Sequence, residues 1–219
     1  MSPVVSDAPE GEDSVREHSV RYLAAAARLA EAVDPRQIDE LAHALAGIRA
    51  REGRLFVLGV GGGAGHAGHA VNDFRKLCAL ESYAPTDNVS ELTARTNDDG
   101  WETSFSGWLE ISRLRERDAL LVFSVGGGSR EHNVSTNLVR AMEAARDAGA
   151  AIYGVVGAPG GTLAELADVA ILLEPPPALR TPLVESFQAV VWHALVSHPA
   201  LAVKAGHWES LGLGALSNS

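Results

Sequence analysis

Short apolar runs alternate along the chain with segments of helical periodicity. The runs lack the polar–apolar alternation of half-exposed strands, so they are typical of strands that are buried on both faces. They lie at 54–60, 119–125, 151–157 and 169–175, with a weaker candidate at 81–86. Because helical segments separate them, the pattern predicts an α/β fold, a three-layer sandwich with a parallel five-stranded sheet at its centre.

The helical segments fill most of the chain between these runs. They are expected at 15–33, 35–51, 64–80, 89–95, 105–111, 132–148, 161–167 and 180–197. Asp34 followed by Pro35 is typical of a helix start, and we expect the first two helices to form an N-terminal helical hairpin. We interpret residues 1–13 as a disordered leader, 14–198 as a single domain that includes the N-terminal helices, and 199–219 as a C-terminal tail.

Composition and charge exclude several classes of protein. The 219 residues include one cysteine, Cys78, which rules out an internal disulfide framework and a zinc finger built on cysteines. The formal net charge of −10 argues against a surface for nucleic acid or for an anionic membrane. No apolar run reaches the ~20 residues that span a bilayer, and no signal peptide is recognisable. We therefore expect a cytoplasmic protein that binds neither nucleic acid nor membrane.

Two of the apolar runs end in similar glycine-rich turns, GVGGGAG at 59–65 and SVGGGS at 124–129. A glycine turn between a strand and a helix lets the backbone approach a ligand and directs N–H groups at an anion, usually phosphate. The second turn adds hydroxyl groups, so we expect a sugar phosphate there. The candidate substrate-binding residues of the two turns are Gly61, Gly62, Gly63, Ser124, Gly126, Gly127, Gly128 and Ser129.

Two other interpretations of these turns stay open. The glycines could serve only to make tight turns. The first turn also fits a loose dinucleotide-binding pattern, Gly59-x-Gly61-x-x-Ala64. That pattern needs an acidic residue at the end of a second strand about 20 residues later, and no convincing strand ends there.

Four side chains in two helical segments could form a metal site. His69 and Asp73 lie four residues apart and share one helix face. Glu185 and His193 lie eight apart and project broadly to one side of the last helix. Two imidazoles and two carboxylates suit zinc or another divalent cation, although a histidine on a helix often has only a structural role.

The polar stretch TNDDGW at 96–101 interrupts a predicted helix. Asn97 and Asp98 lie in it, and a carboxylate in a loop bounded by glycine can hold sugar hydroxyls. The same residues could instead form an Asx turn or a helix cap.

Together these segments resemble the sugar isomerase (SIS) domain family and, within it, the phosphoheptose isomerases. The resemblance covers about residues 20–198 and is carried by 59–74, 91–105, 124–129, 154–168 and 184–193. It implies a flavodoxin-like SIS fold and an enzyme that interconverts ketose and aldose phosphates through an enediolate. The implied reaction converts sedoheptulose 7-phosphate to D-glycero-D-manno-heptose 7-phosphate. The resemblance also implies a homo-oligomer, expected to be a tetramer whose N-terminal helices bundle.

The resemblance further implies roles for individual residues. His69 and Asp73 fall on a family His and Glu, while Glu185 and His193 fall on a family Gln and His. These four positions imply a site for a divalent metal, and we expect zinc. Asp73 and His193 are the implied acid–base pair, and Glu185 is also an implied substrate contact.

Asp98 falls on a family loop aspartate that contacts substrate, and 124–129 fall on the family's phosphate loop. The chain departs from the family at Val60 and Gly63, where the family has Asn and Ser, and at Asp73, which is shorter than Glu. These departures indicate a divergent branch. They leave two alternatives: a non-catalytic SIS protein that binds phosphosugars or regulates, and an isomerase or epimerase of another phosphosugar.

Overall fold

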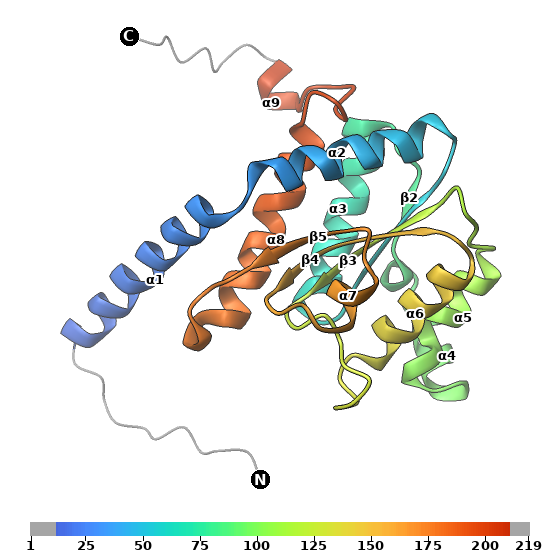
Figure 1. Ribbon diagram of the computed structural model, residues 1–219, viewed down its shortest axis with the longest axis horizontal. Coiled ribbons are helices and arrows are strands. Elements are labelled where there is room, and N and C mark those ends of the chain that lie inside the picture. The colour runs from blue at the N-terminus through green and yellow to red at the C-terminus, as the bar shows by residue number, and fades with distance from the viewer. Residues whose placement is uncertain (1–11, 211–219) are drawn as a thin grey trace.

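A parallel sheet of five strands lies at the centre of the molecule, in the order β2-β1-β3-β4-β5 (Figure 1). The computed structural model of the chain describes residues 12–210. The strands are β1 (Leu55–Gly59), β2 (Ser82–Tyr83), β3 (Ala119–Ser124), β4 (Ala151–Gly157) and β5 (Val169–Leu173). The predicted α/β class and the predicted strands are therefore confirmed. The weak candidate at 81–86 shortens to the two residues of β2, at the edge of the sheet.

The helices follow the predicted segments closely. They are α1 (Glu12–Ala32), α2 (Pro35–Ala50), α3 (Gly62–Cys78), α4 (Val89–Asp98), α5 (Ser104–Ile111), α6 (Thr136–Asp147), α7 (Gly161–Leu166), α8 (Arg180–Ser197) and α9 (His207–Ser210). Short 3-10 helices lie at η1 (Pro85–Asp87), η2 (Trp101–Thr103) and η3 (Pro177–Leu179). α2 begins where predicted because the Asp34 carboxylate accepts a hydrogen bond from the Arg36 backbone N–H at 2.9 Å. Within the described range, none of the helices is long and apolar enough to cross a membrane.

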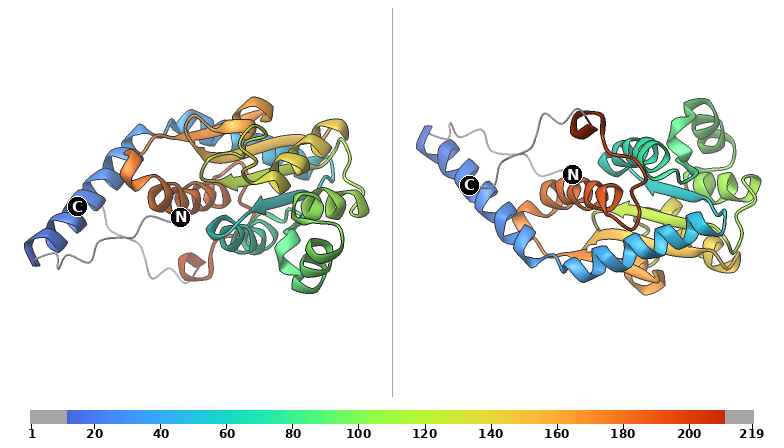
Figure 2. Two further views of the ribbon diagram at one scale, coloured as in Figure 1. Left: turned by 90° about the horizontal axis from the view of Figure 1, so that it is seen from below. Right: turned by 90° about the horizontal axis from the view of Figure 1, so that it is seen from above.

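Alternate strand residues point into two hydrophobic clusters, one on each face of the sheet. On one face, Val57, Leu121 and Val155 pack beneath α2, α3 and α8. On the other face, Leu58 and Val122 pack beneath α5, α6 and α7. The two further views show the helical layers on either side of the sheet (Figure 2). Burial on both faces explains why the strands appear in the sequence as continuous apolar runs.

The predicted N-terminal helical hairpin is wrong. α2 follows α1 after only Val33 and Asp34 and continues in broadly the same direction, so α1 projects from the body as an arm (Figures 1 and 2). A hairpin requires the chain to reverse, whereas Asp34 (φ −73°, ψ 112°) only bends it before Pro35 starts the next helix. The base of the arm packs on the body through Ala25 and Leu29, which are buried.

The structure describes only part of the expected leader and part of the expected tail. Most of the expected leader, 1–13, lies outside the described residues, and residues 12 and 13 already belong to α1. The expected tail, 199–219, is described as far as residue 210. Its first residues return to the domain at the end of α3, so they are part of the folded body.

Several contacts hold the segment after α8 in place. Leu201 is fully buried, and its carbonyl accepts a hydrogen bond from the Arg49 guanidinium at 2.6 Å. The backbone N–H groups of Val203 and Lys204 donate to the Leu77 carbonyl at 2.8 and 3.1 Å. These bonds satisfy a carbonyl at the end of α3, where intrahelical partners run out.

A buried ion pair joins the two central strands at their starts. Asp118, which precedes β3, is fully buried. Its carboxylate accepts hydrogen bonds from the Arg54 guanidinium at 2.6 Å, the Arg54 backbone N–H at 2.9 Å and the Arg115 backbone N–H at 3.2 Å. The hydrogen bond to Asp118 raises the pKa of the Arg54 guanidinium. Since Arg54 immediately precedes β1, the pair aligns β1 with β3.

Candidate active site

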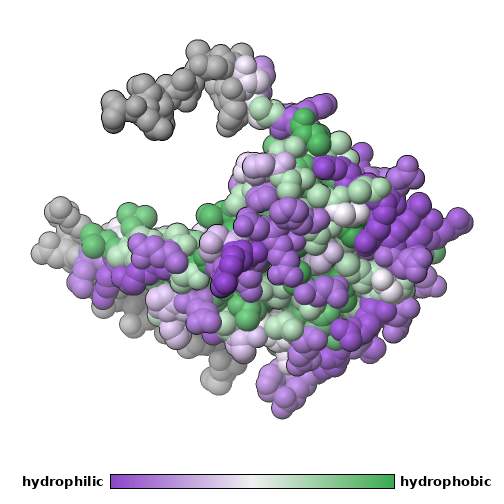
Figure 3. Space-filling view, turned by 45° about the horizontal axis from the view of Figure 1, so that its top comes forward, coloured by the Kyte–Doolittle hydropathy of each residue, from purple (hydrophilic) through white to green (hydrophobic). Residues whose placement is uncertain are grey.

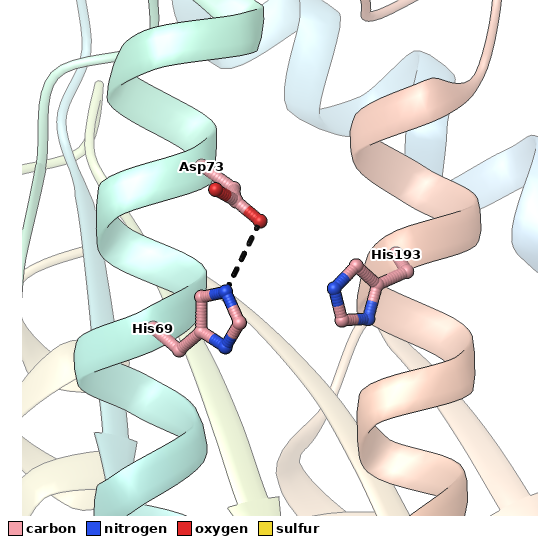
Figure 4. A group of neighbouring side chains, drawn as sticks. All are labelled: His69, Asp73 and His193. Atoms are coloured by element: carbon pink, nitrogen blue, oxygen red, sulfur yellow. Dashed lines mark ion pairs between the residues drawn. The ribbon is translucent and has the colours of Figure 1, made fainter. Parts of the chain in front are cut away.

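His69, Asp73 and His193 converge between α3 and α8 (Figure 4). One ligand atom of each residue lies within 4.8 Å of those of the other two. His69 and Asp73 lie one turn apart on the same face of α3, and His193 projects toward them from the neighbouring α8. Three of the four predicted metal ligands, including the predicted acid–base pair, thus meet in one place.

The two α3 residues differ in their exposure to solvent. Nε2 of His69 lies 3.6 Å from Oδ2 of Asp73, and the side chains are 58% and 15% exposed. Oδ1 of Asp73 accepts a hydrogen bond from the Asn72 side-chain amide at 2.8 Å. One carboxylate oxygen is therefore held by a neighbour on α3, while the other faces the His69 imidazole.

His193 is held in one orientation by its own helix. Its Nδ1 lies 2.7 Å from the Ala189 carbonyl oxygen. Because a carbonyl only accepts, Nδ1 carries the proton, and Nε2 of the neutral ring keeps a free lone pair. The ring also stacks on Trp192, with centroids 3.5 Å apart, and Trp192 is fully buried. The lone pair is thus available to bind a cation or to accept a proton.

The donor set of these three residues fits a divalent cation. Two imidazoles and one carboxylate form the protein part of catalytic zinc sites, which leave a further position open for water or substrate. The His193 bond to a backbone carbonyl is the kind of outer contact that orients a ligating histidine. The chemistry of the residues is therefore compatible with the predicted metal.

Glu185, the fourth predicted metal ligand, lies elsewhere. It precedes His193 by eight residues, about 12 Å along α8, and its carboxylate lies over Gly62 at the start of α3. A Cβ atom on Gly62 would lie 2.6 Å from the Glu185 carboxyl carbon, so a larger residue there would displace the carboxylate. The negative charge is favourable there, because a helix N-terminus carries partial positive charge.

This contact changes the interpretation of the first glycine turn. Gly61–Gly63 was predicted to bind the substrate, but the carboxylate of Glu185 already lies against the start of α3. Gly63 is also needed for packing, since a Cβ there would lie 2.8 Å from the Phe123 carbonyl oxygen. A second anion at this turn would face the repulsion of Glu185.

The second glycine turn keeps donors free for a ligand. Oγ of Ser124 accepts from the Gly127 backbone N–H at 2.9 Å, and Oγ of Ser129 accepts from the His132 backbone N–H at 3.1 Å. Each hydroxyl acts as acceptor in these bonds, so its own O–H can still donate. Gly126 is exposed between them.

Gly127 and Gly128 have a structural role in the same turn. Their carbonyls accept hydrogen bonds from the Leu163 and Thr162 backbone N–H groups at 3.0 and 3.1 Å, at the start of α7. Both take a positive φ, and a Cβ on Gly127 would lie 1.7 Å from the Gly160 carbonyl oxygen. The tight-turn interpretation therefore holds for these two glycines, whether or not a ligand also binds.

Asn97 and Asp98 do not lie in a loop, as the sequence suggested. They are the last two residues of α4, both exposed, and the Asn97 side-chain amide donates to Asp98 Oδ1 at 2.7 Å. The helix extends over them because the Asp99 backbone N–H still donates to the Arg95 carbonyl, four residues earlier. At its start, the helix is capped by Asn88. α4 lies on the opposite face of the sheet from α3 and α8, so one chain does not bring these residues to the histidines.

A cavity adjoins the three converging residues. Its volume is about 660 Å³, and its lining includes Asp73 and His193 together with residues 202–206. Lys204 therefore lies near the candidate site, a position that sequence reasoning did not assign. Lys204 follows His193 by eleven residues, and only the return of the chain onto α3 brings it close.

Known proteins share the fold of this chain and part of its sequence. The SIS domain model matches residues 21–157. The lincomycin biosynthesis protein LmbN of Streptomyces lincolnensis is 37% identical over 161 residues, which cover 67% of this chain and only 56% of that protein. The phosphoheptose isomerase of Rhodospirillum rubrum is 32% identical over 148 residues, 65% of this chain and 73% of that protein. A solved phosphoheptose isomerase from Neisseria gonorrhoeae, 24% identical, matches in fold with a TM-score of 0.72 over 83% of this chain and 97% of that one.

Proposed function

Because this chain belongs to the SIS domain family and to its phosphoheptose isomerase branch, we propose that it converts sedoheptulose 7-phosphate to D-glycero-D-manno-heptose 7-phosphate. The similarity to a phosphoheptose isomerase supports the broader activity of an aldose–ketose isomerase of phosphosugars over the non-catalytic alternative. The observation that carries the proposal is the convergence of Asp73 and His193 from two helices.

The reaction moves a proton between C1 and C2 of the open-chain sugar. A base must take a proton from carbon, and a second group must serve the neighbouring oxygen. Asp73 offers a carboxylate that is largely shielded from solvent, and His193 offers the free lone pair of Nε2. We assign these two residues the acid and base roles, which they can share because their ligand atoms lie within 4.8 Å.

The second glycine turn is the better candidate for the phosphate. Its hydroxyls and the exposed Gly126 offer donors, whereas Glu185 brings negative charge to the first turn. The turns follow adjacent strands, β1 and β3, so both open at the same edge of the sheet. His69 lies seven residues beyond Gly62, about 10 Å along α3, a distance that an open-chain heptose phosphate covers.

A divalent cation would be held by His69, Asp73 and His193, and we propose zinc. While Nε2 of His193 binds the cation its one free lone pair is occupied, so Asp73 would then be the base. When bound, such a cation polarises the sugar carbonyl and lowers the energy of negative charge on its oxygen. The protein residues themselves orient the sugar and move the proton, as described above. Glu185 is not part of this proposed ligand set.

The activity can be tested by incubating the purified protein with sedoheptulose 7-phosphate and following both sugars by NMR. We expect the aldose phosphate to appear, to stop appearing after chelation, and to return when zinc is added. Absence of product from the zinc-loaded protein would contradict the substrate assignment. Full activity after complete removal of metal would contradict the proposed metal while leaving the isomerase intact.

A second substrate class is favoured by one comparison. The chain is more similar in sequence to LmbN, at 37% identity, than to the phosphoheptose isomerase of Rhodospirillum rubrum, at 32%. LmbN is named for the biosynthesis of an antibiotic, so we propose an isomerase or epimerase of another phosphosugar as the alternative. The same NMR assay with a panel of pentose, hexose and heptose phosphates distinguishes the two.

We also propose that the protein is a homotetramer. The arm α1 exposes apolar side chains, including Val20 (62% exposed) and Leu23 (67% exposed), and the space-filling view shows apolar surface along it (Figure 3). Light scattering of the purified protein is expected to give four times the chain mass. Replacing both Val20 and Leu23 with serine should lower the measured mass. A monomeric wild type would contradict the proposal.

A further inference from the structure

The segment after α8 forms a wall of the cavity beside the proposed catalytic pair. Residues 202–206 line the same cavity as Asp73 and His193. From this arrangement, and on the basis of the proposed isomerase function, we propose that Lys204 is a further catalytic residue. Its ammonium group stabilises the negative charge that develops on the sugar oxygens at C1 and C2.

The backbone at Lys204 is fixed, so its side chain starts from a defined place. The N–H groups of Val203 and Lys204 both donate to the Leu77 carbonyl, at 2.8 and 3.1 Å. Leu201, three residues earlier, is fully buried and bonded to Arg49. Because the backbone is already anchored, only the side chain of Lys204 has to be ordered when it holds its charge near the reacting atoms.

The position of Lys204 along α3 indicates which end of the substrate it meets. Gly62 begins α3 beside the glycine turns, and Leu77, which holds Lys204, lies fifteen residues later, about 22 Å along the axis. His69 and Asp73 lie between them. A phosphate bound at the turns is therefore too far away for Lys204, whereas the C1 end of the same molecule, bound near Asp73, lies closer to Leu77 and to the cavity that Lys204 lines.

The chemistry of the reaction calls for a cation there. When the base removes a proton from the carbon next to the carbonyl, the electron pair moves onto the carbonyl oxygen and gives an enediolate. Return of the proton to the other carbon completes the isomerisation without net loss of atoms or electrons. Among the described residues that line this cavity, Lys204 is the one with a permanent positive charge, and a fixed cation stabilises such an oxygen most in the transition state.

Steady-state kinetics of Lys204→Ala give the first test. We expect kcat to fall by about a hundredfold with little change in KM, because the charge on oxygen exists mainly in the transition state. Lys204→Arg, which keeps a cation, should restore part of kcat. The matched control is Lys76→Ala, since Lys76 is the other lysine of the chain, is exposed on α3 and does not line the cavity. An unchanged kcat, or a raised KM alone, would overturn the assignment.

Ligand binding gives a second readout that does not depend on turnover. A 6-phosphohexonohydroxamate mimics the enediolate of a heptose phosphate, whereas heptitol 7-phosphate keeps the phosphate but has no carbonyl. Both ligands are titrated by calorimetry into wild-type and Lys204→Ala protein of equal metal content. The variant should bind the hydroxamate at least about tenfold more weakly and bind the heptitol phosphate with unchanged affinity. An equal loss of affinity for both ligands, or no loss of affinity for either, would overturn the inference.

The two proposals fail in different ways. If the wild type isomerises a phosphosugar and the Lys204→Ala variant binds the hydroxamate with the same affinity as the wild type, only the proposed role of Lys204 is wrong. If the wild type isomerises no phosphosugar and binds neither ligand, the proposed function is wrong, and the role of Lys204 falls with it.

Discussion

Replacing His193 with alanine is expected to lower kcat by about a hundredfold to ten-thousandfold, the usual range for loss of a general acid or base. The imidazole is exposed at the site, and one of its nitrogen atoms lies within 4.8 Å of ligand atoms of Asp73 and His69. Because the side chain contributes little to the core, the fold should survive. The measurement is the steady-state rate with sedoheptulose 7-phosphate, together with the thermal unfolding midpoint.

The chain offers a closely matched control for this variant. His43 on α2 is also exposed, and its Nδ1 lies 2.7 Å from the Asp39 carbonyl oxygen, the same bond that His193 makes to Ala189. His43→Ala therefore removes the same groups away from the site and should keep full activity. Undiminished turnover in His193→Ala would show that the proton is moved by other groups.

Replacing Asp118 with alanine is expected to lower the free energy of unfolding by about 3–5 kcal/mol, as for other buried ion pairs that lose one partner. The change leaves the Arg54 guanidinium, 16% exposed, without its carboxylate. It also removes the acceptor of two backbone N–H groups, those of Arg54 and Arg115. Since these groups precede β1 and β3, the loss falls on the two central strands.

Urea denaturation at one fixed protein concentration measures this loss. The control is Glu165→Ala, because Glu165 pairs with Arg130 on the surface away from α1, with side chains 67% and 47% exposed. Such surface pairs contribute under about 1 kcal/mol. A loss below about 1 kcal/mol for Asp118→Ala would mean that water replaces the carboxylate and that the pair does not align the strands.

The sheet could be predicted from sequence because its strands are buried on both faces. β4, at Ala151–Gly157, matches its predicted run residue for residue. The direction in which one helix leaves the next was harder to predict from the sequence. Asp34 and Pro35 mark a helix start equally well in a hairpin and in a bent arm, so the course of α1 depends on its packing through Ala25 and Leu29.

The parts of the candidate site that depend only on which residues share a helix face could be predicted from the sequence. His69 and Asp73 had to share a face of α3, whatever the rest of the fold. Glu185 and His193 share a helix, but two turns separate them, and only the packing of α8 on α3 shows that the carboxylate reaches Gly62 instead. Lys204 could not be found in this way, because its position results from bonds to Leu77 that no local pattern reveals.

The contact between Glu185 and Gly62 has a consequence for the direction of binding. Two look-alike strand–glycine–helix units stand next to each other, and a phosphorylated chain could in principle enter either one. Because the Glu185 carboxylate lies against the first unit, its negative charge repels a phosphate there, and the second unit is left as the better phosphate site. In the proposed reaction the sugar would therefore bind in a single orientation, with its phosphate toward the second glycine turn and its carbonyl end toward Asp73 and His193.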